Sequence, residues 1–183
     1  METEPFFKDY NDNPRMIRLS EMLGKDRKTI IWCRYTHEIE NIYSMLCADY
    51  EEGSTVKFFG EVSKKNRELA IRRFENEATF FVANKTCAGY GLNLQFCDNV
   101  YYYSNDWDYA TKIQSEDRVH RMGQETEVEI TDMYAYNTID YRVLKCLARK
   151  EQLVNEFKGC IANMKNKNDL RKWIDGEAIG EEK

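Results

Sequence analysis

The 183-residue sequence predicts an α/β fold, with a central, mainly parallel β-sheet and helices on both of its faces. Short β-rich runs alternate along the chain with longer segments whose apolar residues recur at helical spacing. Several of the short runs are almost continuously apolar, which is typical of strands buried on both faces. The length fits one domain, and a hydrophobic content of 42% is enough for a buried core.

Five segments have the pattern expected of strands. The first is an apolar run, whereas the last alternates between polar and apolar residues, which favours a place at or near an edge of the sheet. In chain order they are residues 29–33 (TIIWC), 55–59 (TVKFF), 79–83 (TFFVA), 99–104 (NVYYYS) and 127–136 (EVEITDMYAY).

Amphipathic segments lie between and after these strands. Their apolar residues recur three or four positions apart, and small polar residues stand where helix N-caps are expected. The expected helices are residues 37–48, a helix capped by Ser63 that ends near Phe74, and a helix capped by Asn137 or Thr138 that ends near Glu156.

Charge and composition exclude several classes of protein. A net charge of −5 argues against a protein coated in positive charge, although a local basic stripe can still bind nucleic acid. The six cysteines never form C-x-x-C and the two histidines lie far apart, so no metal site is expected. Most cysteines stand in apolar runs, as reduced core residues do, which suggests a cytosolic compartment. No apolar stretch reaches the roughly 20 residues of a membrane helix, and the acidic, aromatic N-terminus does not resemble a signal peptide.

The glycine-containing loop NKTCAGYGLNLQ follows the third predicted strand, at the end of a parallel strand where functional loops lie. Gly89 and Gly91 begin a G-x-G-x-x-G pattern, but Leu94 occupies the third glycine position. The loop also does not follow the first strand, so we do not expect a dinucleotide site. Its glycines can let backbone N–H groups approach an anion, and Thr86 offers a hydroxyl. A plain turn between strand and helix is the competing interpretation.

The run QSEDRVHRMGQ places Gln114, Arg118 and Arg121 at spacings of 4 and 3, which puts them on one face of a helix. Two arginines on one face can grip a phosphate group, whereas an ordinary solvated surface would pair them with Glu116 or Asp117. The 183 residues contain no G-x-x-x-x-G-K-S/T loop and no strand that ends in an Asp-Glu pair. The chain alone therefore lacks the phosphate cradle and metal site of a complete NTPase.

These two segments resemble known helicase motifs. KTCAGYGLNLQ is similar to motif V, and QSEDRVHRMGQ to motif VI, of superfamily-two helicases. The form Q-x-x-x-R-x-H-R-x-G-Q resembles the Swi/Snf-like, DNA-translocating ATPases. KTIIWCRYTHEIENIYSML (28–46), FFGEVSKKNRELAIRRF (58–74) and Trp107 resemble further parts of that family's second lobe.

The resemblance implies a three-layer RecA-like (P-loop NTPase-like) lobe over residues 15–157, after a lead-in over 1–14 and before a charged helical tail over 158–183. It also implies a partner, an N-terminal RecA-like lobe on the same or a separate polypeptide. ATP with Mg²⁺ is then bound mainly by that partner lobe. The chain would then be the second motor lobe of a DNA-translocating ATPase and catalytically incomplete alone. A non-catalytic DNA- or protein-docking module derived from such a lobe is the alternative.

Residue roles follow from the matched motifs. Arg118 and Arg121 correspond to arginine fingers, and Gln114 to a residue that orients the γ-phosphate or the attacking water. Gly91 and Asn93 are expected to line the ATP cleft, and no metal ligand is expected. The implied contacts to the backbone of double-stranded DNA are Thr86, Lys85, Lys64 and Arg67.

Two positions depart from the family's pattern. Trp107-Asp108-Tyr109 stands where the family usually has Trp-Asn-Pro, and Ser104 stands where an aspartate is common. Both departures bear on substrate and subfamily. We expect a cytoplasmic protein without a membrane partner, of bacterial or phage origin, with a nuclear location if it is eukaryotic.

Overall fold

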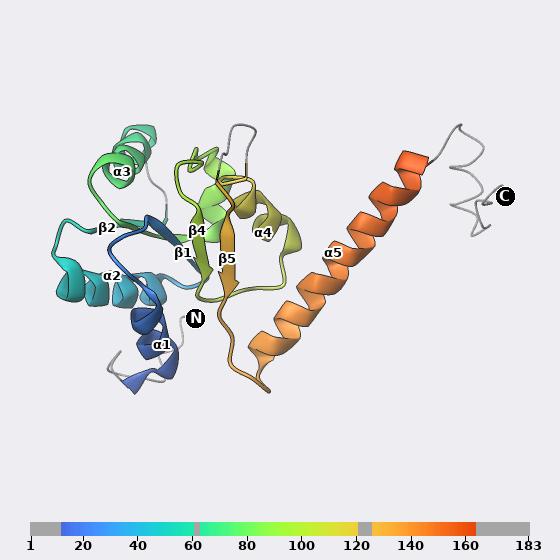
Figure 1. Ribbon diagram of the computed structural model, residues 1–183, viewed down its shortest axis with the longest axis horizontal. Helices are drawn as coiled ribbons and strands as arrows, with labels where there is room; N and C mark the ends of the chain where they lie inside the picture. Colours follow the sequence, from blue (N-terminus) through green and yellow to red (C-terminus); the bar gives the residue numbers. More distant parts are fainter. Residues whose placement is uncertain (1–11, 61–62, 121–125, 164–183) are drawn as a thin grey trace. The chain divides into compact units, whose positions relative to one another are not determined.

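All strand pairs in the described part of the chain are parallel, and the five strands follow the order β2-β3-β1-β4-β5 (Figure 1). The computed structural model describes residues 12–60, 63–120 and 126–163. The strands are β1 (Thr29–Cys33), β2 (Thr55–Phe58), β3 (Phe80–Asn84), β4 (Asn99–Tyr102) and β5 (Glu129–Asp132). The predicted parallel sheet is thus confirmed.

Each of the five predicted strands is present; the first has its predicted bounds, and the other four are shorter or shifted. The fourth ends at Tyr102 rather than Ser104, and the last covers only Glu129–Asp132 of the ten residues expected. The strand pairing stops at Tyr102 and Asp132. The edge position predicted for the last strand is confirmed, because β5 pairs only with β4 among the described strands.

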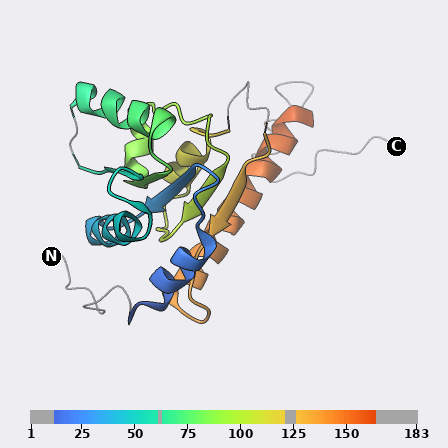
Figure 2. The same ribbon diagram turned by 60° about the vertical axis from the view of Figure 1, so that its left-hand side comes forward.

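Helices cover both faces of the sheet (Figures 1 and 2). On one face lie α1 (Pro14–Met22) and α2 (Thr36–Tyr50), and on the other α3 (Lys64–Asn76), the 3₁₀ helix η2 (Lys85–Tyr90) and α4 (Tyr109–Glu116). The sequence did not indicate α1, which contributes only Met16, Leu19 and the following Leu23 to the core. Asn13 caps it by accepting a hydrogen bond from the Arg15 backbone N–H at 3.0 Å.

The strand β1 divides the apolar core into two clusters because successive side chains point to opposite faces. Ile30 and Trp32 pack in the cluster beneath α3, η2 and α4. Ile31 and Cys33 pack in the cluster beneath α1 and α2. All five residues of β1 are buried, as expected of the central strand of a covered parallel sheet.

Two predicted helix caps are present. Ser63 Oγ accepts a hydrogen bond from the Asn66 N–H at 3.3 Å at the start of α3. Of the two alternatives for the last helix, Thr138 is the residue whose hydroxyl accepts, from the Asp140 N–H at 3.3 Å. Asn137 adopts a left-handed backbone conformation (φ 60°) in the preceding turn.

The final helix, α5 (Ile139–Asn163), extends beyond its expected end at Glu156. The chain divides into two compact units between Leu144 and Lys145, within this helix. In the first unit, Arg15 of α1 forms an ion pair with Asp140 in the first turn of α5. The expected boundaries after residues 14 and 157 stay predictions.

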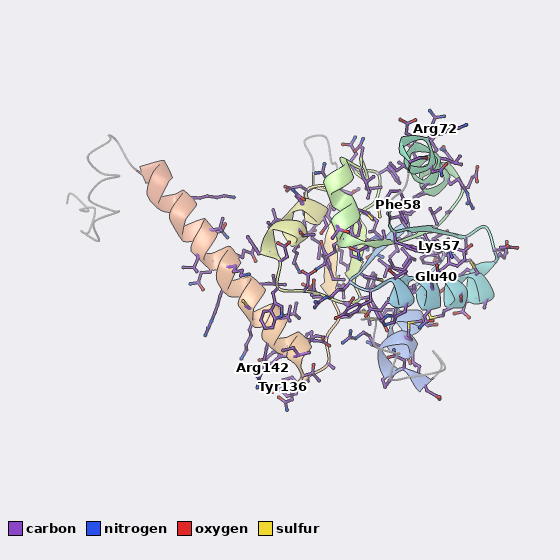
Figure 3. All side chains as sticks on the ribbon, turned by 180° about the vertical axis from the view of Figure 1, so that it is seen from behind. Glu40, Lys57, Phe58, Arg72, Tyr136 and Arg142 are labelled. Carbon is purple, nitrogen blue, oxygen red and sulfur yellow. The ribbon has the colours of Figure 1, made fainter. Side chains whose placement is uncertain are left out.

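The edge strand β2 carries a charge that discourages pairing with other chains. Lys57 is exposed and its Nζ lies 2.6 Å from Glu40 Oε2 of α2 (Figure 3). The same ammonium lies 4.6 Å from the centroid of the Tyr43 ring. A lysine held in this way protects an open sheet edge.

We expect Phe81→Ala to destabilise the fold by about 3–5 kcal/mol. Phe81 is fully buried and its ring contacts Phe58, Phe74 and Trp32, with centroid distances of 5.8, 5.2 and 6.4 Å. Urea denaturation followed by circular dichroism measures the change. The matched control is Leu69→Ala on the exposed side of α3, for which we expect a change within about 0.5 kcal/mol. Equal effects from both variants would contradict this account of the core.

Candidate functional site

The carboxyl ends of four strands meet at one edge of the sheet, and polar residues lie at or shortly after the end of each of them. The register aligns Cys33 with Asn84, Trp32 with Tyr102, and Tyr102 with Asp132. The segments that follow β1, β3, β4 and β5 therefore lie side by side. In an open α/β sheet this edge is where ligands bind.

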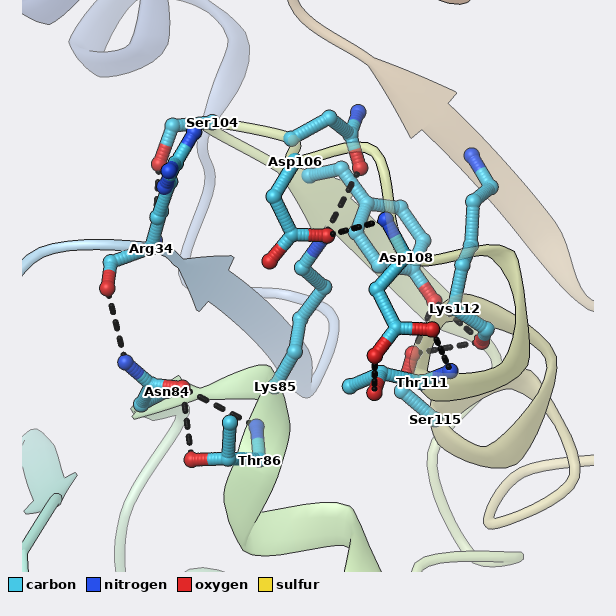
Figure 4. A network of polar contacts seen from close by, with 12 residues as sticks. Arg34, Asn84, Lys85, Thr86, Ser104, Asp106, Asp108, Thr111, Lys112 and Ser115 are labelled. Carbon is cyan, nitrogen blue, oxygen red and sulfur yellow. Dashed lines mark hydrogen bonds and ion pairs between the residues drawn. The ribbon is translucent and has the colours of Figure 1, made fainter. Parts of the chain in front are cut away.

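Asn84, the last residue of β3, joins two of these segments (Figure 4). Its Nδ2 donates to the Arg34 carbonyl at 2.7 Å, and its Oδ1 accepts from the N–H and the hydroxyl of Thr86 at 2.9 and 2.8 Å. These bonds fix the start of η2 against the end of β1. They place two exposed residues, Thr86 and Arg34, next to each other.

Ser104, where the family commonly has an aspartate, is bonded to a carboxylate from another element. Its hydroxyl donates to Glu38 Oε2 at 2.5 Å and accepts from the Arg34 N–H at 2.8 Å. The same carboxylate oxygen accepts from the N–H groups of Arg34 and Tyr35 at 3.2 and 3.1 Å. Glu38 thus supplies a negative charge at the turn between β1 and α2.

Lys85 is turned into the protein. Its side chain is 1% exposed, and its Nζ lies 3.1 Å from Asp106 Oδ1 and 3.4 Å from Asn105 Oδ1. Burial lowers the pKa of the Lys85 ammonium, and the nearby Asp106 carboxylate opposes that shift. This geometry gives Lys85 a structural role, and we leave it out of the DNA contacts proposed below.

The helix α4 begins at Asp108, whose carboxylate accepts from the Thr111 N–H at 3.2 Å and hydroxyl at 2.6 Å. The hydrogen bonds from Thr111 lower the pKa of the Asp108 carboxyl. Asp and Asn are comparable N-caps, so Asp108 can cap the helix as well as an asparagine would. Tyr109 takes the first helical position, where proline is favoured but not required.

The prediction that Arg118 shares a helix face with Gln114 is wrong. The helix α4 ends at Glu116, so exposed Gln114 is helical whereas Arg118 lies in the turn that follows. The Arg118 carbonyl instead accepts the Leu94 N–H at 3.1 Å, a tertiary bond that brings this turn against the glycine-containing loop. Arg121, the second predicted arginine finger, lies outside the described residues.

The side chain of Arg118 contains a donor without a partner. Its Nε is buried and makes no hydrogen bond within the described ranges. Leaving a buried donor unpaired costs about 1–3 kcal/mol, so such atoms are rare in folded proteins. Arg118 Nε, like Trp32 Nε1, is thus a donor that the described part of the chain leaves unpaired.

The predicted nucleotide residues lie on the loop that Leu94 ties to Arg118. Gly91 is exposed and has a φ of +72°, a conformation that residues with a Cβ rarely adopt, which explains a glycine there. Asn93 is exposed as well. The predicted DNA contacts Lys64 and Arg67 belong to α3, and their side chains lie outside the described part.

Sequence reasoning missed a polar network between α4, β4 and β5. Lys112 Nζ lies 2.6 and 2.7 Å from the two carboxylate oxygens of Asp132, and 4.4 Å from the centroid of the Tyr102 ring. The Tyr102 hydroxyl shares a 2.6 Å hydrogen bond with Ser115 Oγ. Asn105 directly follows the predicted fourth strand, whereas Asp132 lies within the predicted fifth strand, and nothing in the sequence identifies the partners of either residue.

The described residues contain no group of three or more His, Cys, Asp or Glu side chains placed to hold a metal ion. None of their helices combines the length and the apolar character of a membrane-spanning segment.

Comparison with known proteins agrees with the fold and the motifs. Residues 14–123 match the model of the helicase conserved C-terminal domain. A crystal structure of the C-terminal part of the Fun30 ATPase domain superimposes with a TM-score of 0.69 at 23% identity, over 75% of this chain and 46% of that one. At that identity the likeness shows the fold.

Curated relatives come from several kinds of organism. Human lymphoid-specific helicase is 32% identical over 152 residues, which are 77% of this chain and 18% of that protein. Helicase SWR1 of Saccharomyces cerevisiae is 28% identical over 141 residues, which are 76% of this chain and 9% of that protein. An uncharacterized ATP-dependent helicase of Mycoplasma pneumoniae is 29% identical over 141 residues, which are 75% of this chain and 13% of that protein. The chain therefore spans less than a fifth of the length of these relatives, and it belongs to the helicase conserved C-terminal domain family as the C-terminal, RecA-like lobe of a Swi/Snf-like superfamily-two helicase.

Proposed function

We propose that this lobe is the second half of an ATP-dependent motor that translocates on double-stranded DNA. It closes against an N-terminal RecA-like lobe and supplies arginine fingers and contacts to the DNA backbone, and it is catalytically incomplete alone. The observation that carries the proposal is the buried, unpartnered Arg118 Nε next to the glycine-containing loop.

The geometry around Arg118 supports a role at a phosphate. The bond from Leu94 N–H to the Arg118 carbonyl fixes the backbone from which the guanidinium projects, so little reorganisation is needed when an anion arrives. Arg118 and Arg121 stabilise the charge that develops on the transferring γ-phosphoryl group. Arginine fingers of this kind are worth about 10³–10⁵ in rate.

Other residues position the reaction. Gln114, exposed on α4, orients the γ-phosphate or the attacking water, and Gly91 and Asn93 line the ATP cleft. Mg²⁺, held mainly by the N-terminal lobe, neutralises phosphate charge. The open conformation of Gly91 lets the backbone approach a nucleotide closely.

Thr86, Lys64 and Arg67 contact the DNA backbone in this proposal, and the structure adds Arg34 as a candidate. Arg34 and Thr86 are both exposed and are joined through Asn84. On α3 the described side chains Lys65, Arg72 and Arg73 are exposed, with Glu68 and Glu75 interleaved; Figure 3 labels Arg72. Contacts to phosphates hold DNA without reading its sequence, as a translocating motor requires.

The expected partners are the N-terminal lobe, on the same or a separate polypeptide, and double-stranded DNA. Because the relatives come from fungi, human and mycoplasma, the expected cytoplasmic location and bacterial or phage origin stay predictions. A docking module without motor activity predicts no effect of the arginines on hydrolysis, and the first experiment below tests that difference.

In a protein that joins this lobe to its N-terminal lobe, we expect Arg118→Ala and Arg121→Ala each to lower DNA-stimulated kcat by about 10³-fold or more. DNA affinity should stay within about twofold, because neither arginine is assigned to DNA. Steady-state ATP hydrolysis and fluorescence anisotropy with duplex DNA measure the two quantities.

Arg18→Ala is the matched control for these variants. Arg18 is an exposed arginine on α1 that pairs with Glu21 at 2.9 Å, and its loss should leave both measurements unchanged. If kcat of the two site variants equals that of the wild type, the lobe is not the source of arginine fingers and the docking alternative stands.

Duplex DNA binding by the 183-residue chain should weaken as salt increases, because phosphate contacts release counterions. For the double variant Lys64→Ala/Arg67→Ala we expect the slope of log K against log salt to become shallower by about 2. A salt series measured by anisotropy gives this slope for the wild type and the variant.

The control is Lys25→Ala, since Lys25 is exposed and precedes β1, at the amino ends of the strands and away from the candidate site. Its slope should equal that of the wild type. A double variant with an unchanged slope would remove Lys64 and Arg67 from the DNA interface.

A further inference from the structure

We infer that Asp132 is a positioning residue that couples DNA contact at the glycine-containing loop to the arginine-bearing turn after α4. This inference rests on the function proposed above and names how two parts of the same site communicate. Asp132 ends β5 and belongs to neither helicase-like motif.

The Asp132 carboxylate binds α4 on one side. Its two oxygens accept from Lys112 Nζ at 2.7 and 2.6 Å, and the Lys112 side chain is only 12% exposed. Lys112 is on the same helix as Gln114, two residues before it, and its helix leads directly into the Arg118 turn. The ion pair thus sets the position of α4 against β5.

The same carboxylate reaches the glycine-containing loop through the segment after β4. Asp132 Oδ1 also accepts from Asn105 Nδ2 at 2.6 Å, and Asn105 Oδ1 accepts from Lys85 Nζ at 3.4 Å. Asp106 holds that ammonium at 3.1 Å. Lys85 directly precedes Thr86, the proposed DNA contact, so an unbroken series of bonds joins Thr86 to α4.

A second carboxylate gives Lys112 an alternative partner. Glu116 Oε1 lies 3.9 Å from Lys112 Nζ, one turn along α4 and two residues before Arg118. In this structure the ammonium is bonded to Asp132, and a shift of it towards Glu116 would provide the second arrangement that coupling between two sites requires. Apolar side chains would hold α4 to β5 at least as firmly, so packing alone does not require an ionic network here.

The test measures DNA stimulation, defined as the ATPase rate with duplex DNA divided by the rate without it, in a protein with both lobes. For Asp132→Asn we expect stimulation to fall about tenfold, with the rate without DNA and the KM for ATP each within about twofold of wild type. Lys112→Met should behave alike, and the double variant should lose no more than either single one, because both remove the same bond.

Glu129→Gln is the matched control. Glu129 lies on the same strand as Asp132 but at its amino end, where it forms an ion pair with Arg27 at 2.6 Å. Its DNA stimulation should equal that of the wild type. Asn105→Ala distinguishes loss of coupling from a folding defect. It breaks the link to Lys85 but leaves the Lys112–Asp132 ion pair in place, and we expect it to lose DNA stimulation as Asp132→Asn does.

The outcomes separate this inference from the proposed function. A wild-type protein without DNA stimulation would overturn the proposed function, and the coupling role with it. Stimulation in the wild type that is retained by Asp132→Asn and Asn105→Ala would overturn the coupling role alone. A lower melting temperature with rates reduced equally with and without DNA would assign Asp132 a purely structural role and would also overturn it.

Discussion

The parallel pairing of β1 with both β3 and β4 is the constraint on which the rest of the structure depends. Every side chain of β1 is buried, with Ile30 and Trp32 in one core cluster and Ile31 and Cys33 in the other. This double burial fixes the register of the neighbouring strands. Because parallel strands end at the same edge, the register also decides which loops become neighbours.

Where the ladder ends, buried and half-buried polar side chains replace apolar packing. Asn84, Glu38 and Asp132 each accept or donate several hydrogen bonds between segments that are distant in the sequence. Burying such groups is costly unless their partners are present, so the bonds hold the loops in one arrangement. The loops are therefore organised before a ligand arrives. In the described part of the site, the Arg118 Nε is a donor without a hydrogen-bond partner.

Much of the site's layout could be predicted from strand-end positions. The rule that functional loops follow parallel strands correctly brought the loop at Asn84–Gln95 beside the segment that contains Gln114 and Arg118, as the Leu94–Arg118 bond shows. The family resemblance implied Lys85 as a DNA contact. A lysine is most often exposed, and only the partners Asp106 and Asn105, some 20 residues away, make its burial possible.

The sequence by itself determined the class of fold, the five strands, the edge position of the last one and the cap at Ser63, because apolar periodicity and capping are local properties of the chain. It also determined the motifs by which the family is identified. Only the tertiary structure showed that α4 ends at Glu116 and that the turn after it is bonded to the glycine-containing loop, because the hydrogen bond from Leu94 N–H to the Arg118 carbonyl joins positions 24 apart and is not a local property of the chain. Only the tertiary structure joined Asp132 to Lys112 and Asn105, since ion pairs across strands depend on register and not on local pattern.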